Sequence, residues 1–210
     1  MRNRLVAAVL ATLSVVALAG CTTPSPGTPT PDSRSSTDET STSTTENDDD
    51  LPSDGAPKVT NPIDVSHFEQ NPCDAFTPAQ AQQFDLEAGK RQDTDFGNGC
   101  AWRNPETGGS VTLGFASVDK RGLSSTYRAE KEGDFTYFEP IDDIEGHPAV
   151  AYDVNSSKPT AACFVDVGVT DELTFATRVG LSANNVGEKD PCELSAQVAG
   201  MILKNMQERS

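Results

Sequence analysis

The chain has 210 residues, of which 35% are hydrophobic, and a formal net charge of −16 at pH 7. A surface this acidic repels nucleic acids and anionic lipid headgroups, so we exclude DNA and RNA as partners. A protein partner is expected to offer a basic face instead.

The first twenty residues are typical of a bacterial signal peptide. Arg2 and Arg4 give a positively charged start, and the fifteen residues 5–19 are almost entirely apolar. As a helix this run would rise about 22 Å, short of the roughly 20 residues that a bilayer core requires. The pattern predicts a removable signal peptide over residues 1–20 rather than a permanent transmembrane helix.

The segment closes with Leu18-Ala19-Gly20-Cys21, which resembles the lipobox of bacterial lipoproteins. The resemblance implies that the thiol of Cys21 receives diacylglycerol and that cleavage then occurs before Cys21. The alternative is an ordinary secretory signal followed by a chance cysteine. We expect a protein anchored by lipid to the extracytoplasmic face of the cell membrane, because several acyl chains hold a protein stably whereas one holds it only marginally.

Residues 21–60 are predicted to form a disordered stalk that begins at the lipidated Cys21. The segment is rich in Ser, Thr, Pro and Asp and contains few apolar residues, so it cannot bury enough surface to offset its chain entropy. Its eight acidic and two basic residues leave a net charge of about −12 on residues 61–210. The acidic run at 48–50 lacks the ligand spacing of a calcium loop, and the Ser/Thr/Pro composition permits O-glycosylation.

Four cysteines remain beside Cys21, and an even set in an exported chain is typical of disulfides. Three pairings are open, and we favour the two that close the shortest loops, Cys73–Cys100 and Cys163–Cys192. Four thiolates on zinc are the alternative, but the sequence lacks the CxxC spacing of such sites, so we expect no metal.

Residues 61–210 are predicted to form a single disulfide-stabilised domain. Thr77 can cap a helix that Pro78 starts, with Gln80 completing a capping box, and this helix should end at 84 or 86. A strand is expected over 99–103, and alternating apolar residues predict a half-buried strand over 111–115. A short helix should follow from Leu123, because Leu123 and Tyr127 are one helical turn apart.

Four further strands and a C-terminal helix are predicted after residue 134. Asp190 can cap this helix and Pro191 can start it, and residues 194, 198, 201, 202 and 206 form its apolar stripe. We expect an α+β fold, an antiparallel meander sheet with two or three helices packed mainly on one face and two disulfides. The strands are expected over residues 135–138, 149–154, 163–169 and 173–179.

The order of several short motifs resembles domain of unknown function 3558, a family of actinobacterial cell-envelope lipoproteins. The resemblance covers nearly all of residues 61–210 and implies an envelope location, but it carries no catalytic residues. The motifs are Asn71-Pro72-Cys73, Gly99-Cys100-Ala101-Trp102, Gly146-His147-Pro148-Ala149-Val150, Cys163-x-Val165-x-Val167 and Asp190-Pro191-Cys192.

No catalytic or cofactor motif is present, since the sequence has no GxSxG, SxxK, HExxH or phosphate-binding glycine loop. We therefore expect no enzyme activity and no cofactor. Trp102 is interpreted as a core residue beside Cys100, and His147 as a structural residue of a turn. Either would be a candidate ligand contact if it were exposed in a groove. The acidic residues at 142–145 are interpreted as an exposed loop rather than a cation site.

Three functions remain as hypotheses. The first is a binding or interaction module of the cell envelope, with a basic envelope protein as its partner. The second is a carrier or receptor for a lipid or other apolar ligand, held in a pocket between the sheet and the helices. The third is an envelope enzyme, for which the sequence offers no convergent nucleophile and base.

Overall fold

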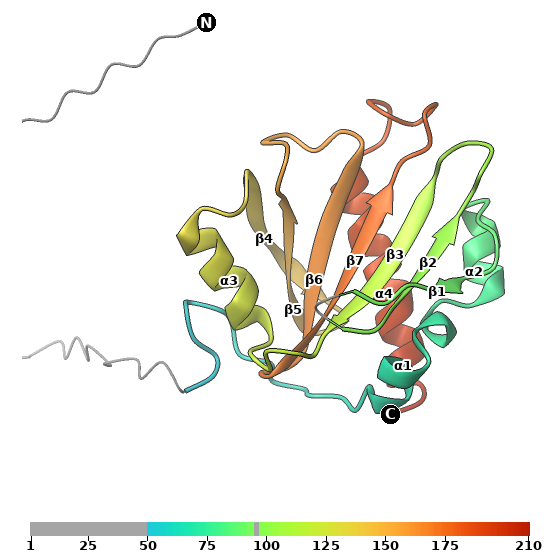
Figure 1. The fold of residues 1–210 in the computed structure, drawn as a ribbon. Coiled ribbons are helices and arrows are strands. Elements are labelled where there is room, and N and C mark those ends of the chain that lie inside the picture. Colours follow the sequence, from blue (N-terminus) through green and yellow to red (C-terminus); the bar gives the residue numbers. More distant parts are fainter. Residues whose placement is uncertain (1–49, 95–96) are drawn as a thin grey trace, which may run out of the picture. The chain divides into compact units, whose positions relative to one another are not determined.

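The structure is a computed structural model that describes residues 50–94 and 97–210 (Figure 1). The predicted signal peptide, the lipidation site Cys21 and the stalk as far as residue 49 lie outside the described residues. Within the described part of the chain, no helix is long and apolar enough to cross a membrane.

The described residues form one antiparallel sheet of seven strands in the order β1-β2-β3-β7-β6-β5-β4. The first three strands form one meander and the last four form another, and the two are joined where β3 pairs with β7. The predicted antiparallel α+β fold is therefore confirmed. The strands are β1 Lys90–Arg91, β2 Gly99–Arg103, β3 Ser110–Ala116, β4 Tyr137–Ile144, β5 His147–Asp153, β6 Ala162–Thr170 and β7 Leu173–Gly180.

The main core lies between this sheet and helix α4, Pro191–Gln207. Alternation in β6 directs Cys163, Val165, Val167 and Val169 to one face, where all four are fully buried. The predicted stripe of α4 packs against that face, with residues 198, 202 and 206 buried and residues 194 and 201 half-buried. Oδ1 of Asp190 accepts hydrogen bonds from the backbone N–H groups of residues 192 and 193, which confirms the predicted cap.

Three short helical segments lie on the same side of the sheet as α4: α1 Ser66–Gln70, the 3₁₀ helix η1 Pro72–Ala75 and α2 Pro78–Gln83. The side chain of Asn205 in α4 donates to the carbonyl oxygen of Ala75 and to Oε1 of Gln80, and so fixes η1 and α2 to α4. Thr77 and Gln80 form the predicted capping box. The opposite face carries α3, Leu123–Glu132, so the helices pack mainly on one face, as predicted (Figure 1).

Both predicted disulfides are present. Cys73 of η1 bonds Cys100 of β2, with 5.2 Å between their Cα atoms. Cys163 of β6 bonds Cys192 in the first turn of α4, with 4.9 Å between their Cα atoms. Each bridge ties the start of a helical segment to a strand. Asn71 makes no side-chain cap for η1, whereas Asp190 caps α4.

The predicted strand at 135–138 is wrong in its bounds, since β4 begins at Tyr137 and runs to Ile144. Asp142 and Asp143 therefore belong to an edge strand and not to a loop. The sequence did not predict β4 here because Pro140 and three acidic residues interrupt the apolar pattern. An edge strand tolerates both, since one side of its backbone needs no partner.

The predicted stalk also ends earlier than expected, because residues 50–60 pack on the domain. This segment, which we call the strap, contains Ser53 and Val59, and both are buried. The backbone N–H of Ser53 donates to Oγ of Ser124 in α3 at 2.8 Å, and the N–H of Val59 donates to Oδ1 of Asp171 at 2.9 Å. Residues 50–60 therefore belong to the folded domain rather than to the stalk.

Candidate functional site

Trp102 lies in the core and is only 2% exposed, so it lines no surface groove. Its ring packs edge-on against Phe76, with 5.4 Å between ring centroids. The chain before β1 crosses directly over it, because a Cβ atom at Gly89 would lie 2.5 Å from Nε1 of Trp102 and 2.8 Å from Sγ of Cys100. The core interpretation is confirmed, and the structure contradicts a ligand contact at Trp102.

His147 is also buried, with 1% of its surface exposed. Its Nδ1 lies 2.8 Å from the carbonyl oxygen of Gly168, which fixes the ring at the start of β5. Its Nε2 has no hydrogen-bond partner among the described residues. A side chain this enclosed cannot reach a surface ligand, so His147 has a structural position and the candidate ligand contact at His147 is wrong.

The larger of two surface hollows that we describe lies between the edge strand β4 and α4. It has a volume of about 370 Å³. We call it the acidic groove, and it is lined by Asp143, Ile144, Glu145, Ala196, Gln197, Gly200, Met201 and Lys204.

The floor of the acidic groove is apolar and its rim is charged. Ile144, Ala196 and Met201 are half-buried, whereas Asp143 and Glu145 are exposed. Gly200 brings α4 close to β4, since a Cβ atom there would lie 3.6 Å from Cγ2 of Ile144. An apolar floor with an acidic rim fits an apolar side chain flanked by basic residues.

A single ion pair crosses the described rim of the groove, between Nζ of Lys204 and Oε1 of Glu145 at 3.0 Å. Both side chains are well exposed to solvent, so this pair contributes little stability and can exchange partners readily. Asp143, the other carboxylate that lines the groove, makes no ion pair among the described residues. The rim therefore keeps negative charge that no neighbouring cation neutralises.

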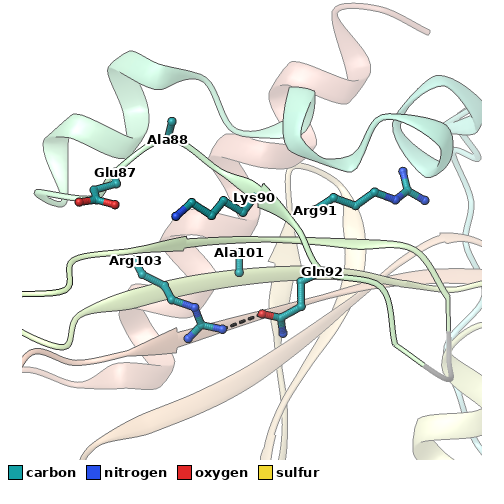
Figure 2. Close-up of a pocket in the computed structure, with 7 residues that line it drawn as sticks. All are labelled: Glu87, Ala88, Lys90, Arg91, Gln92, Ala101 and Arg103. Atoms are coloured by element: carbon teal, nitrogen blue, oxygen red, sulfur yellow. Dashed lines mark hydrogen bonds between the residues drawn. The ribbon is translucent and has the colours of Figure 1, made fainter.

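The second hollow, of about 180 Å³, lies beside β1 and is lined by both acidic and basic side chains (Figure 2). Lys90 and Arg103 lie on one side of the sheet here, and Nη2 of Arg103 donates to Oε1 of Gln92 at 2.7 Å. Arg91 points to the other side, where it pairs with Asp93 and donates to the carbonyl oxygen of Gln70. The lining of this hollow combines charged side chains of both signs with Ala88 and Ala101.

A carboxylate that was not predicted from sequence is buried beneath α3. Oδ2 of Asp166 in β6 accepts from Oγ1 of Thr126 in α3 at 2.7 Å, and its Oδ1 accepts from the hydroxyl of Tyr152 at 3.1 Å. Burial raises the pKa of Asp166 to about 6, although the two hydrogen bonds act in the opposite direction. The same burial, with the neighbouring carboxylate, raises the pKa of Tyr152.

The described residues contain no group of three or more His, Cys, Asp or Glu side chains that could hold a metal ion. Asp142 and Asp143 lie where the register of β4 with β5 shifts, between Ile141 and Ile144. The groove was missed from sequence because its two walls come from segments about 55 residues apart. A glycine in the middle of a helix, Gly200, was the one local sign of a close approach.

No curated protein and no solved structure matches this chain. A family model described as a protein of unknown function, DUF3558, matches residues 16–205. The match runs from the predicted signal segment to the last turns of α4 and covers most of the chain. The chain therefore belongs to the DUF3558 family.

Proposed function

We propose that this protein is a lipid-anchored lipoprotein on the extracytoplasmic face of the cell membrane, where it acts as a binding module of the cell envelope. Its acidic groove receives a basic segment of a partner protein. The observation that carries the proposal is the groove itself, an apolar floor from α4 and β4 beneath a rim on which Glu145 pairs with Lys204 and Asp143 has no ion pair among the described residues.

The charge of the chain supports a basic partner. Acidic residues outnumber basic ones by 32 to 16, so the field around the molecule attracts cations. Such a field raises the association rate more than it lengthens the life of the complex. The apolar floor then supplies the desolvated contact that slows dissociation.

The interior supports a binding module over a lipid carrier. A carrier of the expected kind needs space between the sheet and the helices, but that layer is occupied by the buried side chains of the core. Hydrogen bonds of Thr177 with Ser195 also join β7 to α4 across it. Both hollows described above lie on the surface and have charged rims, which suits a partner protein better than an apolar ligand.

The groove can be tested in cells with a photo-crosslinking residue at position 197, which lines it and is exposed. We expect an adduct with one partner, mapped to a peptide that contains Lys or Arg beside an apolar residue. The matched control places the same residue at the exposed position 120, far from the groove in sequence and outside its lining. Equal yields of adduct at both positions would refute the proposal that the partner binds in the groove.

A charge-reversal variant provides a second test of the groove. The double variant Asp143→Lys, Glu145→Lys should abolish the adduct at position 197, because it replaces both carboxylates that line the groove with like charges for a basic partner. The control reverses two exposed acids elsewhere, Glu172→Lys and Glu188→Lys, and changes net charge equally. If both double variants weaken the adduct equally, only overall charge matters and the groove has no specific role.

The lipid anchor needs its own experiment, since it rests on residues outside the structure. We expect the wild-type protein to partition into the detergent phase and the Cys21→Ser variant to remain in the aqueous phase, because acyl chains supply the membrane affinity. Unchanged partitioning of the variant would show that Cys21 carries no lipid.

A further inference from the structure

A second surface, on the opposite face of the sheet from α4, has the reverse charge. Helix α3 covers the part of this face formed by β5 and β6, where Thr126 contacts Asp166. The part formed by β1, β2, β3 and β7 lies to the side of α3 and carries no helix in the described structure (Figure 1). We call this part the open face.

Strand register fixes which residues the open face presents. The open face consists of Lys90 in β1 and of alternate residues in three other strands. These alternate residues begin at Gly99 in β2, at Ser110 in β3 and at Thr174 in β7. These positions include three basic residues, Lys90, Arg103 and Arg178, and no acidic residue. The whole chain has twice as many acidic as basic residues, so the sign of the charge on the open face is opposite to that of the chain.

None of these three cations makes an ion pair with a described residue. Lys90 and Arg103 are exposed, and Arg178 is half-buried. The guanidinium of Arg178 lies over the ring of Phe164, 5.4 Å from its centroid, and that ring stacks in turn on Tyr152 at 5.2 Å. The ring holds the guanidinium in place while its N–H edges stay available to an anion.

The side chains of Ser110 and Arg178 converge on Gly180, which lies between them on the open face. A Cβ atom at Gly180 would be 2.6 Å from Oγ of Ser110 and 3.5 Å from Nη1 of Arg178. Arg103 is directly opposite Ser110 in the register, so the guanidinium of Arg178 extends toward the row that contains Arg103. The absence of a side chain at Gly180 therefore lets these two donors lie close to the strand and to each other.

We infer that the open face binds an acidic polysaccharide, with Arg103, Arg178 and Lys90 contacting successive anionic groups of the polymer. Guanidinium groups bind carboxylates through two parallel hydrogen bonds. Arg103 and Arg178 lie on strands separated by β3, so their Cα atoms are roughly 10–12 Å apart, which suits charges repeated along a chain better than one small ion.

The remaining donors of the open face favour a sugar polymer over an acidic protein. Hydroxyls of Ser110 and Thr112 and the amide of Gln92 lie between or beside the cations, and they can bind sugar hydroxyl groups. Protein partners depend on large apolar or aromatic anchors in desolvated pockets. Between Arg103 and Arg178 the open face offers small residues and hydroxyls instead.

The test measures binding of the full chain, purified in mild detergent, to polygalacturonate, with neutral dextran and poly-glutamate as comparison polymers. We expect binding of polygalacturonate that weakens with salt, and no binding of dextran. The double variant Arg103→Gln, Arg178→Gln should lower the affinity about tenfold or more, since it removes two charge-assisted contacts. The variant Arg178→Lys, which keeps the charge but loses the paired N–H donors, should bind with an affinity between those of the wild type and the double variant.

The matched control is the double variant Lys120→Gln, Lys189→Gln, which removes the same charge at exposed positions outside the open face. Its affinity should change less than about twofold, as expected for distant exposed charges that are screened by salt. An equal loss in both double variants, or no binding of polygalacturonate by the wild type, would overturn the inference. Equal or tighter binding of poly-glutamate would also overturn it and would point to an acidic protein partner.

Discussion

Replacing Asp166 with asparagine should stabilise this protein at neutral pH, although it removes two charge-assisted hydrogen bonds. Asp166 is fully buried under α3, and its two partners, Thr126 and Tyr152, are neutral hydroxyls. It makes no ion pair among the described residues. Keeping an ionised carboxylate there costs free energy that neither hydroxyl fully offsets.

The size and sign of the effect follow from the pKa of Asp166, which burial raises from 3.8 to about 6. Because the folded-state pKa lies above the unfolded one, the protonated carboxyl stabilises the fold. That contribution is fully present below about pH 4 and is lost as the pH rises through about 6. At about 1.4 kcal/mol per pKa unit, the ionised form costs roughly 3 kcal/mol at pH 7.

Urea denaturation at a series of pH values measures this contribution. With the disulfides intact, Asp166→Asn should exceed the wild type in free energy of unfolding by about 1–3 kcal/mol at pH 7, with the gap closing toward pH 4. The exposed Asp142→Asn serves as the control and should change stability by about 0.5 kcal/mol or less. A variant that is destabilised at pH 7, or a gap that does not depend on pH, would refute the reasoning.

Three further predictions concern the elements around the core. Replacing Cys163 and Cys192 by alanine together should lower the free energy of unfolding by about 3–4 kcal/mol, measured by urea titration, because the bridge closes a loop with a sequence separation of 29. Gly200→Ala should raise the melting temperature and stabilise α4 by about 0.5–1 kcal/mol, since the added Cβ meets Ile144 at 3.6 Å, an ordinary contact. Asp190→Ala should cost about 1 kcal/mol, seen as a lower urea midpoint, because two N–H groups at the start of α4 lose their acceptor.

The elements that could be predicted from sequence are those whose pattern is local. Helix α4 combines a capping aspartate, a proline and an apolar stripe within one segment. Strand β6 carries apolar residues at every second position from Cys163 to Val169, on the face that packs against α4. The disulfide pairing followed from loop length alone, since each bridge joins the nearest cysteine along the chain.

The elements that escaped prediction depend on distant partners. Helix α1 has five residues and no side-chain cap, and burial of Phe68 in the core holds it. Strand β1 has two residues and exists only because β2 pairs with it. The open face could not be predicted either, because Arg103 and Arg178 are 75 residues apart and only the β3–β7 register brings them to one surface.

The strap determines how a pulling force would enter the fold. Any tension applied to the chain before residue 50 would first load the contacts of Ser53 and Asp54, which bind Ser124 and Lys131 of α3 and Arg121 just before it. It would then reach Val59, which is held by Asp171 and packs against Gly168. The contacts of the strap would have to break before the tension reached the rest of the seven-stranded sheet. The strap and α3 therefore protect the core from unfolding under small forces.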